Sequence, residues 1–163
     1  MSQLRKAERK KAKLRIGLSG PSGSGKTMSA LYIAYGITGD WSKIALIDSE
    51  TGRGELYAND AKHGIGEYNI LRLTAPFTPE RYIESINTCE NSIGTEVIII
   101  DSISHEWEGK GGCLEINEKV ANTKFRGNSW AAWSETTPRH QSFIEAIITS
   151  PSQTNTTARA KTE

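Results

Sequence analysis

The stretch GPSGSGKT, residues 20–27, decides how the rest of the sequence is interpreted. It matches the pattern Gly-x-x-x-x-Gly-Lys-Ser/Thr in full, and it lies between an apolar run, LRIGLSG, and a segment with helical spacing, KTMSALYIAYGI. In such a loop, glycines let the backbone curl so that its N–H groups point at phosphate oxygens, while the lysine and the last hydroxyl reach the outer phosphates and Mg²⁺. The predicted phosphate-binding residues are Gly20, Pro21, Ser22, Gly23, Ser24, Gly25, Lys26 and Thr27.

Strands and helices alternate along the sequence on either side of this loop. Compact apolar runs predict strands at residues 14–20, 43–48, 68–73 and 96–101. Helical spacing predicts helices at residues 26–37, 78–93 and 129–149, the last one interrupted near Pro138. The strands lack polar alternation, which is typical of a parallel sheet covered by helices on both faces. Residues 105–129 show no clear pattern.

Length and composition indicate one soluble domain. The chain has 163 residues, of which 36% are hydrophobic and 24% are charged, a balance typical of globular proteins. No apolar run is long enough to span a bilayer, and the basic N-terminus lacks the apolar region of a secretory signal, so a cytoplasmic location without membrane contact is expected. Cys89 and Cys113 lack the C-x-x-C spacing of a zinc site, and reduced thiols are expected.

Charge is distributed unevenly, although the net charge is only +1. Residues 1–15 hold seven Lys or Arg and one Glu, whereas the remaining residues hold 13 Lys or Arg against 18 Asp or Glu. We therefore divide the chain into a basic N-terminal arm, residues 1–13, and a domain, residues 14–163. The arm either contacts nucleic acid or an acidic neighbour, or it is a solvated lead-in.

Two carboxylates are candidates for the chemistry next to the phosphates. Asp101 ends the apolar run of residues 97–100, where many P-loop proteins place the aspartate that holds Mg²⁺. The next residue, Ser102, is not suited to activate water, so hydrolysis requires another carboxylate. Glu50 follows the second predicted strand, and the carboxyl ends of parallel strands share one edge of a sheet. Glu50 is therefore the candidate for water activation; Asp48 is expected to be structural, with an exchange of the two roles left open.

The phosphate loop alone does not name the reaction. A guanylate kinase would carry paired arginines after the first helix, and an ABC transporter ATPase would carry an LSGGQ signature; neither is present in the sequence. The nucleophile-elbow motif of a Ser/His/Asp hydrolase is also missing. His105 and His140 are isolated in the sequence, so they are expected to pack or to form hydrogen bonds rather than to bind a metal.

Several motifs together resemble the RecA-like ATPase core, in which the catalytic glutamate follows the second strand. They are GPSGSGKTMSAL, KIALIDSETGRGELYA, DSISHEWEGKGG, WSETTPRH and ARAKTE, and they extend over residues 13–163. More narrowly, they resemble phage-encoded RecA-like ATPases, a group that includes ATP-binding recombination proteins of the single-strand-annealing type. The resemblance implies an α/β RecA-like P-loop NTPase fold for residues 14–163, with a mainly parallel sheet and helices on both faces.

The resemblance also implies cofactors, partners and residue roles. It implies binding of ATP and Mg²⁺, with Thr27 and Asp101 on the metal, and a catalytic set made of Glu50, Lys26 and Asp101. It further implies a homo-oligomer that acts on single-stranded DNA together with a single-strand-binding protein, in the cytoplasm of a phage host cell.

In RecA-like proteins the segment after the metal-binding aspartate is commonly a mobile loop near the DNA. The corresponding segment here is residues 105–130, whose glycines are expected to give mobility. Its candidate DNA contacts, through base stacking and phosphate binding, are Trp107, Lys110, Lys124 and Arg126. Glutamates dilute the positive charge, so a surface loop with a buried tryptophan is the alternative. Trp130 and Trp133 are expected to pack within a helix.

The last 14 residues, SPSQTNTTARAKTE, depart from the family pattern. The resemblance implies an apolar strand before Arg159, but the sequence there is polar, so a weak or truncated last strand and an incomplete sheet edge are expected. Arg159 and Lys161 resemble a basic pair that reaches the γ-phosphate bound by a neighbouring subunit. The alternative is that both are frayed cations exposed to solvent.

These observations favour an ATP-binding and ATP-hydrolysing RecA-like phage protein that acts in DNA recombination or single-strand annealing. A nucleotide-switched DNA- or protein-binding module without significant turnover is the alternative, and a nucleotide kinase is the third hypothesis.

Overall fold

The structure is a computed structural model, and it describes residue 4, residues 6–7 and residues 12–160. Its strands are β1 (Arg15–Gly20), β2 (Ile44–Asp48), β3 (Asn69–Arg72), β4 (Val97–Asp101) and β5 (Gln153–Arg159). Its helices are α1 (Lys26–Thr38), α2 (Pro79–Glu90), α3 (Ser104–Glu108), α4 (Cys113–Lys124) and α5 (Ser129–Thr149), with short 3-10 turns η1 (Trp41–Lys43), η2 (Arg53–Tyr57) and η3 (Ala61–His63). The predicted basic arm lies mostly outside the described residues.

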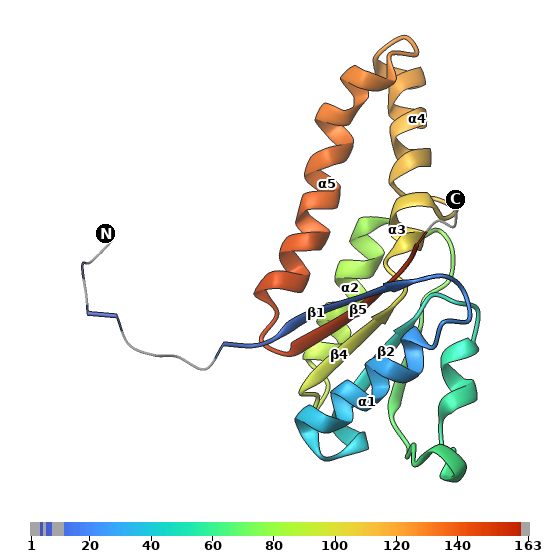
Figure 1. Ribbon diagram of the computed structural model, residues 1–163. Helices are drawn as coiled ribbons and strands as arrows, with labels where there is room; N and C mark the ends of the chain where they lie inside the picture. Colours follow the sequence, from blue (N-terminus) through green and yellow to red (C-terminus); the bar gives the residue numbers. More distant parts are fainter. Residues whose placement is uncertain (1–3, 5, 8–11, 161–163) are drawn as a thin grey trace.

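The five strands form one parallel sheet in the order β1-β5-β4-β2-β3 (Figure 1). The register pairs Asp48 on β2 with Asp101 on β4, and Gly20 on β1 with Arg159 on β5. Because all strands run in the same direction, their carboxyl ends lie at one edge of the sheet, where ligands of open α/β sheets bind. The phosphate loop, which follows β1, therefore lies at the same edge as the ends of β2, β4 and β5.

Helices on both faces of the sheet explain why the central strands lack polar alternation. Every residue of β2 and β4 is buried. Alternate residues of these strands pack on α1, and the others pack on α2 and α5. Each face of the sheet is therefore buried in its own apolar cluster. The α1 side contains Ile44, Leu46, Val97 and Ile99, and the opposite side contains Ala45, Ile47, Ile98 and Ile100. The predicted α/β, RecA-like P-loop fold with a parallel sheet is confirmed.

The last strand is not weak, contrary to expectation. β5 has seven residues and lies between β1 and β4, so it is interior and β1 forms the edge of the sheet. Two of its buried polar side chains donate to backbone carbonyls: Thr154 Oγ1 to Ile147 O at 3.5 Å, and Asn155 Nδ2 to Ala30 O at 3.2 Å, whereas Asn155 Oδ1 has no partner among the described residues. Threonine also suits a strand because it is β-branched. The expectation was wrong because polar side chains can fill an interior strand when backbone carbonyls accept from them.

Residues 105–130 do not form the expected mobile loop. They contain most of α3, all of α4 and two short turns. Glycine allows close packing here rather than mobility, since a Cβ built on Gly112 would lie 2.6 Å from Glu106 O. The turn between α3 and α4 is therefore tight, and it brings the start of α4 against α3.

The helix α5 runs without a break through Pro138, where an interruption was predicted. A proline removes one backbone donor from a helix, but α5 packs against both α2 and α4, and these contacts support it on either side. In Figure 1, α4 and α5 lie side by side and extend beyond the sheet. Although α5 has 21 residues, no helix in the described part of the chain is apolar enough to cross a membrane.

Candidate active site

The phosphate loop connects β1 to α1 in the conformation that the motif predicts. Gly23 and Gly25 have φ values of 78° and 85°, a left-handed conformation that strains residues with a side chain. Gly25 is also the N-cap of α1, and because it has no side chain to cap the helix, the first N–H groups of α1 remain available to an anion. Lys26 Nζ donates to Gly20 O and Pro21 O, both at 2.8 Å, so its ammonium lies over the loop.

Asp101 is held by hydroxyl groups on two sides. Thr27 Oγ1 donates to Asp101 Oδ2 at 2.5 Å, and Thr157 Oγ1 donates to Asp101 Oδ1 at 2.5 Å. The carboxylate is buried, with 4% of the residue exposed. The predicted metal-binding residues Thr27 and Asp101 are thus in direct contact. Thr157 was missed because its polar strand was interpreted as weak, and the sequence holds no local signal that β5 adjoins β4.

The two carboxylates after β2 have different environments. Asp48 is fully buried, and it accepts from the N–H groups of Glu50 at 2.7 Å and Gly54 at 3.1 Å. These bonds fix the turn after β2, which matches the structural role expected of Asp48. Glu50 lines the hollow above the phosphate loop. Glu55 lies at the surface and pairs with Arg72 at 3.1 Å. Of the three carboxylates, Glu50 is the one that faces the loop.

Glu50 forms an ion pair with Arg159 of the same chain. Arg159 Nε donates to Glu50 Oε1 at 3.0 Å, and the second guanidinium nitrogen donates to Oε2. The side chain of Glu50 is 11% exposed and that of Arg159 is 41% exposed. Arg159 is therefore not a frayed cation, because the end of β5 places it at the site. Lys161 lies outside the described residues.

The hollow between these residues has a volume of about 90 Å³. Small-molecule pockets usually measure several hundred Å³, so this hollow is small by comparison. Sequence reasoning missed two lining residues, Arg53 and Tyr57, although both follow Glu50 within one short turn. The lining residues are Ser22, Gly23, Ser24, Gly25, Lys26, Thr27, Glu50, Arg53, Tyr57, Asp101 and Arg159.

Two serines and a histidine form a hydrogen-bonded group next to Asp101. The N–H of Ser102 donates to Ser49 Oγ at 2.9 Å, and Ser49 Oγ lies 2.9 Å from His105 Nδ1. His105 in turn stacks on Phe77, with ring centroids 4.9 Å apart. The peptide bond between Asp101 and Ser102 is cis. Ser102 thus joins the ends of β2 and β4 through its backbone N–H.

The candidate DNA contacts do not form one patch. Trp107 stacks on Trp133, with centroids 5.3 Å apart, so one face of its ring is already covered. Lys110 is exposed before α4, whereas Lys124 pairs with Glu135 at 2.7 Å at the far end of that helix. The helix α4 has 12 residues and is about 18 Å long, at 1.5 Å per residue. The two lysines lie at its opposite ends.

The two other tryptophan predictions have different outcomes. Trp133 packs within the fold, as expected, because its ring lies against Trp107. Trp130 does not pack and is 86% exposed. The helices α4 and α5 form a hairpin, and we define residues 124–130 as its tip. Trp130 lies at this tip together with the exposed Arg126. The packing prediction for Trp130 was wrong because it lies in the first turn of α5, beyond the body of the sheet.

A phosphate loop after β1, an aspartate at the end of β4 and a carboxylate after β2 define a P-loop nucleotide-binding protein of the ATPase type. The chain belongs to the AAA domain family, whose model matches residues 12–163. No curated protein is similar enough to the chain to count as a match.

Proposed function

We propose that the chain binds ATP with Mg²⁺ and hydrolyses the ATP. The observation that carries this proposal is the position of Glu50, which lines the same hollow as the phosphate loop although it follows a different strand from Asp101. Lys26 and the loop N–H groups bind the phosphates, and Glu50 orients the attacking water. Membership of the AAA domain family supports nucleotide binding independently of this geometry.

The oxygen atoms beside the loop fit Mg²⁺. Thr27 Oγ1 and Asp101 Oδ2 lie 2.5 Å apart, and hydroxyl and carboxylate oxygens are the ligands that Mg²⁺ prefers. We assign Thr27 as a direct ligand and Asp101 as a ligand that acts mostly through water, as the metal keeps several waters at such sites. When bound, Mg²⁺ neutralises charge on the phosphates. Thr157 fixes Asp101 from the other side.

We further propose that the protein acts on single-stranded DNA in recombination or annealing, as a homo-oligomer and together with a single-strand-binding protein. This rests on the resemblance to phage-encoded RecA-like ATPases. The tip of the α4–α5 hairpin supports it, because the exposed Arg126 supplies positive charge there and Trp130 presents an exposed ring. Proteins that bind single strands combine cations on the backbone with aromatic rings on the bases.

Turnover of ATP with and without single-stranded DNA tests this function. We expect turnover in the wild type, stimulation by DNA, and loss of both in Lys26→Ala. Trp130→Ala should keep basal turnover and lose the stimulation, whereas Ile93→Ala, which changes another exposed apolar side chain on a distant turn, should keep both. If no DNA changes mobility in a gel at low salt, where phosphate contacts are strongest, the DNA role is excluded. Phosphate transfer to an added nucleoside monophosphate would instead establish a kinase.

The ion pair of Glu50 with Arg159 favours a second candidate function, that of a nucleotide-switched binding module without significant turnover. A carboxylate held by a guanidinium is not free to orient water. In this alternative, ATP changes the oligomeric state or the DNA affinity without being consumed. Sedimentation with ATP and with a non-hydrolysable analogue separates the two functions: equal assembly and no phosphate release would favour the switch.

A further inference from the structure

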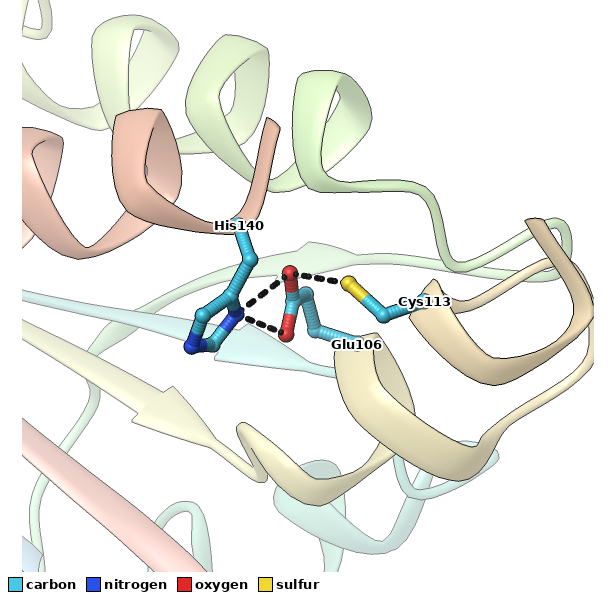
Figure 2. Close-up of side chains that lie close together, drawn as sticks. All are labelled: Glu106, Cys113 and His140. Atoms are coloured by element: carbon cyan, nitrogen blue, oxygen red, sulfur yellow. Dashed lines mark hydrogen bonds and ion pairs between the residues drawn. The ribbon is translucent and has the colours of Figure 1, made fainter. Parts of the chain in front are cut away.

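Three side chains that bind metals elsewhere in proteins meet at the base of the α4–α5 hairpin. Glu106 on α3, Cys113 on α4 and His140 on α5 point toward one another (Figure 2). Cys113 Sγ donates to Glu106 Oε1 at 3.1 Å, and His140 Nδ1 lies 3.0 Å from Glu106 Oε2. One ligand atom from each residue lies within 4.8 Å of the other two. His140 thus forms the kind of hydrogen bond expected of it, and folding brings it next to two residues that are distant in sequence.

The burial of Glu106 is unusual for a residue without a role in the phosphate site. Glu106 is 1% exposed, and a buried carboxylate is costly unless it is paired. Among the described residues, its side-chain partners are Cys113 and His140 alone. The nearby cation Arg139 is engaged elsewhere, because it forms two bonds to Glu80 at 2.6 Å and 2.8 Å. Both partners of Glu106 are thus residues of a type that binds metal ions, cysteine as a thiolate and histidine as a neutral imidazole.

We propose that Glu106, Cys113 and His140 form a binding site for one divalent transition-metal ion of the Zn²⁺ type. A thiolate, an imidazole and a carboxylate are the ligands that Zn²⁺ takes in proteins, at distances of about 2.0 to 2.3 Å. Ligand atoms of a tetrahedral site then lie roughly 3 to 4 Å apart, and small side-chain rotations give this arrangement. The side chain of His140 is 30% exposed, so water reaches the fourth position from that side.

The ligand set separates this site from the one at the phosphate loop. Thiolate and imidazole favour Zn²⁺ over Mg²⁺, whereas the oxygens of Thr27 and Asp101 favour Mg²⁺. The proposed ion joins three helices, of which α3 begins three residues after Asp101. Its effect is to clamp the base of the α4–α5 hairpin to the end of β4. The proposal is independent of the proposed ATPase activity.

Metal binding to the full chain tests the site directly. After treatment with a chelator, the protein is titrated with Zn²⁺ by calorimetry in the presence of excess Mg²⁺, and with Co²⁺ by absorbance. We expect one ion per chain, a thiolate-to-cobalt charge-transfer band, and a higher melting temperature with Zn²⁺. Cys113→Ser should abolish the band, and His140→Asn should weaken binding at least tenfold. Cys89→Ser is the matched control, because Cys89 is also a buried thiol but lies in the apolar cluster on the α2 side of the sheet. This variant should keep the band.

Two results would overturn the proposal. One is a wild-type protein that gives no charge-transfer band with Co²⁺; the other is a band that survives in Cys113→Ser and disappears in Cys89→Ser. Circular dichroism of each variant shows whether it folds. If Cys113→Ser does not fold, the partly exposed His140 decides: unchanged affinity and an unchanged cobalt spectrum in His140→Asn would equally exclude the site.

Discussion

Arg159 forms a bidentate ion pair with Glu50, and Arg159 Nε lies 3.0 Å from Glu50 Oε1. The two residues are 109 positions apart in the sequence, and they meet because β5 and β2 end at the same edge of the sheet. The resemblance to RecA-like proteins implies that Arg159 reaches a phosphate on a neighbouring subunit. Within one chain it instead occupies the carboxylate that we assign to water activation, so turnover requires Arg159 to exchange one anion for another.

Glu50→Gln should keep nucleotide binding and lose turnover. The amide has the same shape as the carboxylate but does not take a proton from water, and loss of such a group typically lowers a rate by about 10² to 10⁴. ATP turnover and nucleotide affinity, measured side by side, check this. Glu55→Gln is the control, because Glu55 pairs with Arg72 at the surface and should turn over ATP normally. Normal hydrolysis by Glu50→Gln would assign water activation to another residue.

Arg159→Ala should lower turnover by about a thousandfold if its guanidinium stabilises the transferring phosphate in a neighbouring subunit. Mixing Arg159→Ala with Lys26→Ala tests the neighbour directly. Each variant alone should be inactive, but in the proposed oligomer a mixture would place the intact loop of one chain against the intact arginine of another, so activity should return. If the Arg159→Ala variant turns over ATP faster than the wild type, and mixing with Lys26→Ala restores no activity, the ion pair is only inhibitory.

Thr157→Val should destabilise the fold and raise the Mg²⁺ concentration needed for turnover. The substitution removes a 2.5 Å hydrogen bond to the buried Asp101, and a bond to a charged group contributes about 2 kcal/mol. Urea unfolding measures the change in the free energy of unfolding. Thr156→Val, on the same strand, should cost less than about 1 kcal/mol, because its hydroxyl reaches only Ile16 O, at 3.4 Å. Equal losses from both variants would show that Asp101 is not specifically supported.

Gly54→Ala should displace the turn that carries Glu50. A Cβ at position 54 would lie 2.4 Å from Leu46 Cδ2 and 3.3 Å from Asp48 Cβ, and overpacking of this kind costs about 1 to 3 kcal/mol. We expect lower stability and lower turnover together. Gly36→Ala, in the interior of α1 with open space around the new methyl group, should instead gain about 0.5 to 1 kcal/mol. Thermal unfolding that ranks the two variants in the opposite order would contradict this packing.

Alkaline pH should destabilise the protein through Tyr68. Burial raises the pKa of Tyr68 from its usual value near 10 to about 12. The folded state then keeps a proton that the unfolded chain loses, so stability is complete below pH 10 and falls between about pH 10 and 12. Tyr68→Phe should show a shallower fall in the free energy of unfolding over this range.

Much of the fold could be predicted from short-range patterns. The loop of residues 20–27 and the apolar runs of β2 and β4 specify a parallel α/β sheet, because both signals are local. The position of β5 was not predictable in this way. Threonine hydroxyls and an asparagine amide find partners only after β5 enters the sheet between β1 and β4, so their suitability for an interior strand is a property of the folded state.

The candidate site divides in the same way. Glu50 and Asp101 could be predicted together, since each ends a strand and parallel strands end at one edge. Thr157 could not, because its role depends on a register in which β5 adjoins β4. The metal-ligand cluster is a clearer case. Cys113 and His140 are 7 and 34 residues from Glu106, a spacing that matches no metal motif and becomes meaningful only when three helices converge.

The interior position of β5 also has a consequence for synthesis on the ribosome. β5 is the last described strand to be made, yet it separates β1 from β4, so a nascent chain cannot close its sheet until residues 153–159 have emerged. Until then both β1 and β4 present unpaired backbone edges, which invite wrong pairing. Contacts between the two ends of a chain also form slowly. Thr157 and Arg159 arrive with the same strand, so the candidate site is complete only once β5 has entered the sheet.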